Sequence, residues 1–152
     1  MNTAVLDATI DRRFQMTAEP KKWMLAVMAE PKLRLALIED DRDLAEVTQV
    51  ALEDEGFSVE VAYDGRQGLD LIARTSPDVV VTDVVMPVLD GLQLIQQLFA
   101  GEGRHPPVIA ISAIGSRLHL ARELGACEAM VKPVEPHELA EVARKVVRRA
   151  QQ

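Results

Sequence analysis

From Leu33 onward the sequence alternates between short apolar runs and segments whose apolar residues recur at helical spacing. Leu33 to Ile38 is a run of strand length, and Leu44, Val47 and Ala51 then mark a helix that ends near Gly56. The alternation repeats, with strands expected at 57–62, 79–81, 108–111 and 129–131 and helices expected around 68–73, 92–99, 118–121 and 139–150. Because the strands are continuous apolar runs, we expect a parallel sheet covered by helices on both faces.

Residues 1–31 show neither the two-residue period of a strand nor the 3.6-residue period of a helix. Pro31 marks a boundary because a proline disfavours helix at the preceding residue. We therefore expect an N-terminal extension over 1–31 and one domain over 32–152. Within the extension, Lys21 to Glu30 is predicted to be a short helix that docks on the domain or on a second subunit. A floppy arm, or an upstream start codon that extends a shorter protein, are the alternatives.

Polar side chains follow four of the expected strands. Glu39 and Asp40 follow the first strand, Asp83 the third, Ser112 the fourth and Lys132 the fifth. The carboxyl ends of parallel strands meet at one edge of a sheet, so these groups should converge there. Clustered carboxylates bind a hard cation such as Mg²⁺, and a carboxylate can accept a phosphoryl group whose charge a hydroxyl and an ammonium then stabilise. The sequence therefore predicts a Mg²⁺-dependent phosphoryl site.

The same residues resemble the signature positions of response-regulator receiver domains. The stretch from Leu35 to Asp41 resembles the acidic first-strand motif, and the stretch from Asp83 to Gly91 closely resembles the motif D-x-x-M-P-x-x-D-G. Ser112-Ala113 and Lys132-Pro133 match the remaining positions in order, and the resemblance covers about residues 33 to 149. It implies a flavodoxin-like, doubly wound (βα)5 fold with strand order 2-1-3-4-5.

The resemblance also implies a role for each of these residues. Asp83 is the expected phosphoacceptor, and it should bind Mg²⁺ together with Asp40 and the backbone carbonyl of Val85. Glu39 should act on the metal through water. Ser112 and Lys132 should contact the phosphoryl oxygens, and the peptide bond from Lys132 to Pro133 is expected to be cis.

Two positions depart from the family pattern. Ala129 stands where receivers usually have Tyr or Phe, and Val134 where Phe is frequent. A methyl group cannot signal by changing rotamer, so we expect the segment from Ile114 to Leu124 to carry the output by backbone displacement. Ala129 also supports an alternative, a degenerate receiver that acts as a phosphorylation-independent scaffold. An aspartate-based phosphatase is disfavoured because its second acid, two residues after the nucleophile, is here Val85.

The remaining candidates have ordinary structural interpretations. Asp41 is expected to be a solvated or capping acid, and Asp90-Gly91 a turn that starts a helix. The three histidines, His105, His119 and His137, are expected at the surface. The basic residues of the last helix are expected to complement its dipole, namely Arg144, Lys145, Arg148 and Arg149.

Composition restricts the partners and the compartment. The net charge of −7 argues against a nucleic-acid or membrane surface, and the one cysteine, Cys127, fits a reducing compartment. The apolar run from Trp23 to Ala29 is too short to span a bilayer. We therefore expect a cytoplasmic protein that is a monomer or a weak homodimer.

The expected function is that of a stand-alone response regulator, because the chain ends just after its last predicted helix. Its partners should be a sensor histidine kinase or a histidine phosphotransfer protein, and a downstream target protein. It should not be an enzyme beyond self-catalysed phosphoryl transfer and slow autodephosphorylation. Apolar Val85 and Ile114 flank the expected phosphoryl site, where polar side chains help to place water, so the phosphorylated state should be long-lived.

Overall fold

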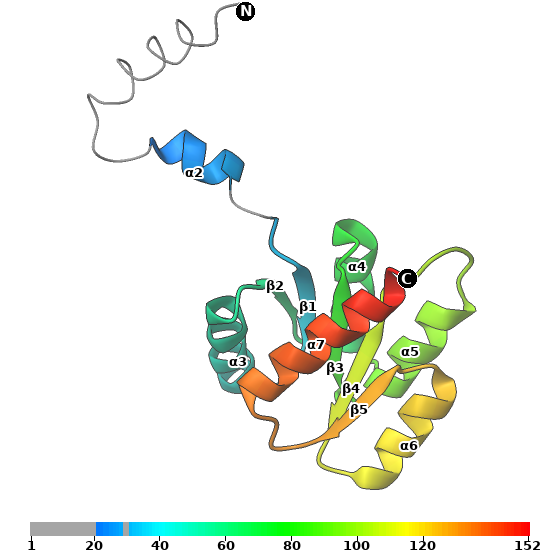
Figure 1. Cartoon of the computed structure of the whole chain (residues 1–152). Helices are drawn as coiled ribbons and strands as arrows, with labels where there is room; N and C mark the ends of the chain where they lie inside the picture. Colours follow the sequence, from blue (N-terminus) through cyan, green and yellow to red (C-terminus); the bar gives the residue numbers. More distant parts are fainter. Residues whose placement is uncertain (1–20, 29–30) are drawn as a thin grey trace, which may run out of the picture. The chain divides into compact units, whose positions relative to one another are not determined.

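The computed structural model describes residues 21–28 and 31–152, and the chain divides into two units between Pro31 and Lys32 (Figure 1). The described part of the first unit contains helix α2 (Lys22–Met28), on which Trp23, Leu25 and Met28 are exposed. Part of the helix predicted over Lys21 to Glu30 is therefore present. The predicted end of that helix at Glu30 lies outside the described residues, as do residues 1–20, and docking of the helix stays a prediction.

The second unit is built on a sheet of five parallel strands in the order β2-β1-β3-β4-β5. This order confirms the predicted 2-1-3-4-5 topology. The central strands β1, β3 and β4 are buried along all or nearly all of their length, as their continuous apolar runs indicated. The strands are β1 (Arg34–Ile38), β2 (Ser58–Ala62), β3 (Val79–Asp83), β4 (Val108–Ser112) and β5 (Glu128–Val131).

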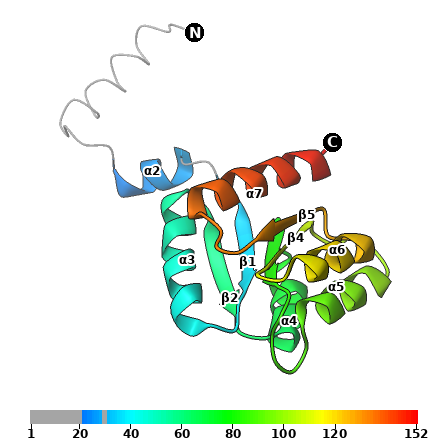
Figure 2. The same ribbon diagram turned by 90° about the horizontal axis from the view of Figure 1, so that it is seen from below.

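Helices cover both faces of the sheet, as predicted (Figure 2). Helices α3 and α7 pack on one face, over a core that includes Leu37, Leu52 and Val146. Helices α4, α5 and α6 pack on the other, over a core that includes Ile38 and Leu94. The five helices of this unit are α3 (Arg42–Asp54), α4 (Gly65–Thr75), α5 (Gly91–Ala100), α6 (Gly115–Leu124) and α7 (Pro136–Ala150).

Aspartates fix where three of these helices begin. The side chains of Asp41, Asp64 and Asp90 each accept a hydrogen bond from the backbone amide three residues later, at the N-termini of α3, α4 and α5. Such a cap contributes about 1 kcal/mol to stability. The expected capping role of Asp41 and the helix start at Asp90-Gly91 are both confirmed. These N-terminal caps hold the loops at the carboxyl edge of the sheet in fixed positions.

Candidate phosphoryl and metal site

The predicted site residues meet at the carboxyl edge of the sheet. Glu39 and Asp40 directly follow β1, while Asp83 and Ser112 are the last residues of β3 and β4. Lys132 directly follows β5. Because β1, β3, β4 and β5 are consecutive neighbours in the sheet, four distant segments of the chain contribute to one site.

Three carboxylates lie close together in this site. One carboxylate oxygen from each of Glu39, Asp40 and Asp83 lies within 4.8 Å of the other two. Glu39 and Asp83 are only 3% and 6% exposed, whereas Asp40 is open to solvent. Three oxygen donors at this spacing suit a hard divalent cation such as Mg²⁺. Within residues 21–28 and 31–152 no other group of three metal-ligating side chains comes together in this way.

Lys132 supplies a positive charge to the acid cluster. Its Nζ lies 2.9 Å from Glu39 Oε2 and 2.9 Å from Asp83 Oδ2, so it bridges the ends of β1 and β3. Partial burial acts to lower the pKa of the Lys132 ammonium, but the hydrogen bonds and charges of Asp83 and Glu39 together raise it. The ammonium therefore stays protonated at neutral pH.

The Glu39 carboxyl has a raised pKa. Burial is the main cause, and the nearby charge of Asp83 adds to it, while the hydrogen bond from Lys132 acts in the opposite direction. Glu39 Oε1 also accepts a hydrogen bond of 3.2 Å from the backbone amide of Asp41. A buried acid with a raised pKa beside a second buried acid gains from a bound cation, which would relieve their repulsion.

Ser112 and Val85 flank Asp83. The Ser112 side chain is buried, and its Oγ accepts a hydrogen bond of 3.1 Å from the backbone amide of Ile114, which leaves the hydroxyl proton available to a further acceptor. The Val85 amide lies 3.3 Å from Asp83 Oδ1 and donates to it. The side chains of Val85 and Ile114 are 52% and 47% exposed, so both apolar groups lie open at the rim of the site.

The loop from β3 to α5 is held by close backbone contacts. Gly91 N–H donates to Val84 O at 2.8 Å, and a Cβ at Gly91 would collide with Asp83 O. Gly65 N–H donates to Leu89 O at 2.9 Å, which ties this loop to the start of α4. Any side chain at Gly91 would therefore displace the backbone next to Asp83.

Sequence reasoning missed the contribution of the loop after β2. That loop holds Tyr63 and Asp64, and the Tyr63 ring lies 4.0 Å from the guanidinium carbon of Arg42. The available signal was topological, because β2 ends at the same edge of the sheet as the four strands whose ends were considered. Inspecting the residues that follow β2, as was done for the other four strands, would have drawn attention to Tyr63 and Asp64.

The departures from the family pattern lie on and after β5. Ala129 is half-buried, and Arg122 of α6 approaches its carbonyl oxygen at 3.5 Å while pairing with Glu128. The Lys132-Pro133 peptide bond is cis, as predicted. Val134 is half-buried beside Lys132 and lines a mainly apolar pocket between α3 and α7.

The three histidines are exposed, as predicted, but the basic cluster of α7 is only partly explained by the helix dipole. Arg148 and Arg149 lie in the last turn, where a positive charge is favourable. Arg144 instead pairs with Glu55 at 3.1 Å and lies over the Phe57 ring. Its main role is therefore to tie α7 to the end of α3.

Comparison with known proteins identifies the family. The family model described as "Response regulator receiver domain" matches residues 35–144. The response regulator MprA of Mycolicibacterium vanbaalenii is 40% identical over 119 residues, which cover 77% of this chain and 51% of MprA. The transcriptional regulatory protein CpxR of Escherichia coli is 39% identical over 119 residues, which cover 77% of this chain and 50% of CpxR. The chain thus spans about half the length of these curated relatives.

Solved structures show the same likeness. The receiver domain of the Francisella response regulator 1452 superposes with a TM-score of 0.73 at 28% identity, over 78% of this chain and 99% of that one. A response regulator receiver domain protein from Clostridium thermocellum gives 0.72 at 27% identity, over 78% and 97%. No helix in the described part of the chain is long and apolar enough to cross a bilayer. The chain belongs to the receiver-domain family of response regulators, the phosphoacceptor signalling domains of two-component systems.

Proposed function

We propose that Asp83 accepts a phosphoryl group from the phosphohistidine of a sensor histidine kinase or histidine phosphotransfer protein. The phosphorylated form then binds a downstream target protein. The observation that supports this most is the position of Lys132, whose ammonium lies 2.9 Å from Asp83 and 2.9 Å from Glu39 within a cluster of three carboxylates. Such an arrangement combines a nucleophilic carboxylate with fixed positive charge.

Mg²⁺ would be held by the Asp40 and Asp83 carboxylates and the backbone carbonyl of Val85, with Glu39 acting through water. The spacing of the three carboxylates supports this assignment, because oxygen ligands within 4.8 Å of one another suit a small hard cation. When bound, the metal supplies positive charge that draws the phosphoryl oxygens toward Asp83.

In the transfer step, a carboxylate oxygen of Asp83 forms a bond to phosphorus as the bond from phosphorus to the donor imidazole nitrogen breaks. The bonding electrons remain on that nitrogen, and the imidazole leaves as a neutral ring because its other nitrogen carries a proton. Lys132 neutralises charge on one phosphoryl oxygen, and Ser112 can donate its free hydroxyl proton to another. Most of the catalysis is positioning, which suits a signalling domain that acts once on itself.

Further assignments remain proposals. We propose a cytoplasmic monomer or weak homodimer with an extension over 1–31, a receiver over 32–152 and no nucleic-acid partner.

Intact mass after incubation with Mg²⁺ and acetyl phosphate tests the proposed function. Wild type should gain one phosphoryl group, and Asp83→Asn should gain none. Asp90→Asn is the matched control, because Asn also caps a helix and Asp90 lies outside the acid cluster; it should be labelled like wild type. No gain by wild type with Mg²⁺ in excess would contradict the proposal and favour the phosphorylation-independent scaffold.

A further inference from the structure

Arg42 stands next to the acid cluster but is not part of it. It is the first residue of α3, two positions after Asp40, and its guanidinium carbon lies 4.0 Å from the centre of the Tyr63 ring. Among the contacts of residues 21–28 and 31–152, Arg42 forms no ion pair with a carboxylate, although Asp40 and Asp41 immediately precede it in the sequence.

This arrangement matters because Asp40 is the acid of the cluster that Lys132 does not contact. Lys132 pairs with Glu39 and Asp83, while Asp40 is exposed. Two residues apart, the Cα atoms of Asp40 and Arg42 are at most about 7.6 Å from each other. A long arginine side chain can cover that distance, so a freely moving Arg42 would pair with Asp40 and compete with Mg²⁺ for it.

Hydrogen bonds hold the backbone from which the Tyr63 ring projects. The backbone amide of Tyr63 donates to Gln67 Oε1 at 3.1 Å, and Asp64 accepts from Gln67 N at 2.8 Å. The next residue, Gly65, is hydrogen-bonded to Leu89 O. A cation over an aromatic face and an exposed ion pair have similar strengths, so a ring within reach can decide which one Arg42 makes.

We propose that Tyr63 is a positioning residue for the metal site, whose ring holds the Arg42 guanidinium away from Asp40 and so leaves that carboxylate free for Mg²⁺. The inference rests on the proposed metal site. The proposed effect depends on the ring face of Tyr63 and not on its hydroxyl. Tyr63 acts on the metal site through the charge of Arg42.

Titration with MgCl₂, followed by the backbone amide shifts of Asp40 and Val85, tests this without any phosphoryl transfer. Tyr63→Leu removes the ring and should weaken Mg²⁺ binding about threefold, the size of an exposed ion pair that now competes. Tyr63→Phe keeps the ring and should bind Mg²⁺ like wild type. Tyr63→Leu combined with Arg42→Gln should bind no more weakly than Arg42→Gln alone, because the competing charge is gone.

Each other result overturns the inference. Unchanged Mg²⁺ affinity in Tyr63→Leu would show that the ring does not restrain Arg42. If Tyr63→Leu weakened Mg²⁺ binding equally with and without Arg42→Gln, the effect would be merely structural. Urea unfolding without Mg²⁺ would then show that Tyr63→Leu lowers stability equally in both backgrounds. If wild type bound no Mg²⁺, the proposed metal site would fail together with this inference, whereas the preceding two results leave the metal site intact.

Discussion

Lys132 and a bound Mg²⁺ would compensate the same negative charge. The ammonium lies 2.9 Å from carboxylate oxygens of Glu39 and Asp83, two of the three acids that could hold the cation. Its charge therefore weakens metal binding while it stabilises the oxygens of the transferred phosphoryl group. Metal affinity and phosphoryl transfer should respond in opposite directions to its removal.

Lys132→Met keeps the length of the side chain and removes its charge. We expect Mg²⁺ to bind about three- to tenfold more tightly, because one competing positive charge is lost at a partly exposed site. Labelling by acetyl phosphate should slow about a hundredfold, the usual effect of removing one stabilising donor. Calorimetric titration and intact-mass time courses measure the two effects, with exposed Lys145→Met as the charge-matched control. Weaker Mg²⁺ binding in Lys132→Met would contradict this reading of the site.

Single residues should also set the lifetime of the proposed acyl phosphate. Val85 and Ile114 are exposed and apolar, and neither can hydrogen-bond an attacking water molecule. Val85→Asn should speed autodephosphorylation by up to about tenfold, which corresponds to about 1.4 kcal/mol of barrier. Loss of label after removal of the phosphodonor gives the rate, and Val85→Ala separates the effect of a polar group from that of lost bulk. A wild-type label that decays as fast as that of Val85→Asn would be inconsistent with a long-lived state.

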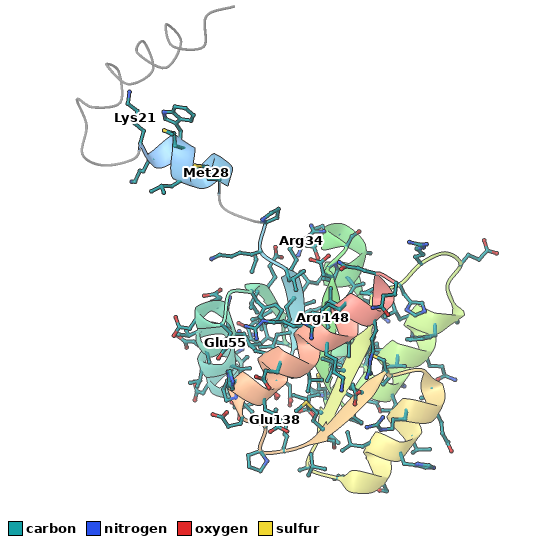
Figure 3. The ribbon with its side chains drawn as sticks, viewed as in Figure 1. Lys21, Met28, Arg34, Glu55, Glu138 and Arg148 are labelled. Carbon is teal, nitrogen blue, oxygen red and sulfur yellow. The ribbon has the colours of Figure 1, made fainter. Side chains whose placement is uncertain are left out.

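At the level of elements, α3 and α7 are joined by a cluster of charges at the end of α3. Glu55, labelled in Figure 3, accepts from Arg144 at 3.1 Å and faces His137 Nδ1 at 2.9 Å. His137 Nε2 faces Glu141 at 3.2 Å. Because both ring nitrogens face carboxylates, both contacts are hydrogen bonds only when the imidazole is doubly protonated. The tie between these helices is therefore sensitive to pH.

The direction of this pH dependence follows from the two pKa shifts. The hydrogen bond to Glu55, with the charges of Glu55 and Glu141, raises the pKa of His137 above its ordinary 6.5, so its contribution is complete below 6.5 and lost as pH rises through the raised value. Hydrogen bonds from His137 and Arg144 lower the pKa of Glu55 below its ordinary 4.5, so its contribution is complete above 4.5 and lost as pH falls through the lowered value. The contact should stabilise the fold most between about pH 4.5 and 6.5.

His137→Gln should therefore lower the free energy of unfolding at pH 5.5 and leave it nearly unchanged at pH 9. Urea unfolding over this range measures the difference. His119→Gln is the control, because among the residues that the structure describes His119 pairs only with Glu123 of its own helix. An equal effect of His137→Gln at both pH values would show that the charged imidazole contributes nothing to the tie.

Helix α6 is the element expected to report phosphorylation. Its N-cap, Ile114, makes no side-chain capping hydrogen bond, and only Leu118 and Ala121 of this helix are buried. The Ile114 amide is instead bonded to Ser112, whose hydroxyl would turn toward a phosphoryl oxygen. Amide hydrogen exchange over Ile114 to Leu124 should change when Asp83 is phosphorylated, whereas exchange in α4 should not. Identical exchange rates in the two states would contradict output through α6.

For the molecule as a whole, the sequence pattern predicted the strands and the convergence of five site residues, and the resemblance to receiver domains predicted the order of the sheet. Continuous apolar runs identified each strand, and the ordered motifs around Asp83 and Lys132 identified the edge at which the strand ends meet. Helix ends were predicted less well because apolar spacing marks only the buried face. Helix α4 extends from Gly65 to Thr75 instead of 68–73, since Asp64 caps its start and left-handed Ser76 ends it.

Contacts between loops could not be predicted from spacing. The approach of Gly65 to Leu89 and the stacking of Arg42 on Tyr63 depend on how two loops from different strands face each other. The same holds for the ion pair between Arg144 and Glu55. From the sequence alone, Arg144 was expected to complement the helix dipole. Side-chain types at strand ends predict which residues share an edge, but only the three-dimensional packing decides which of them touch.

Phosphorylation of Asp83 itself would distinguish a working receiver from a binding scaffold. The most direct measurement is to label the protein with acetyl phosphate and Mg²⁺, reduce the acyl phosphate with borohydride to trap its position, and locate the reduced residue by peptide mass spectrometry. We expect a single reduced residue at Asp83, and none when Mg²⁺ is removed with a chelator. Reduction at Glu39, Asp40 or Asp90 in place of Asp83, or no reduced residue at all, would contradict it.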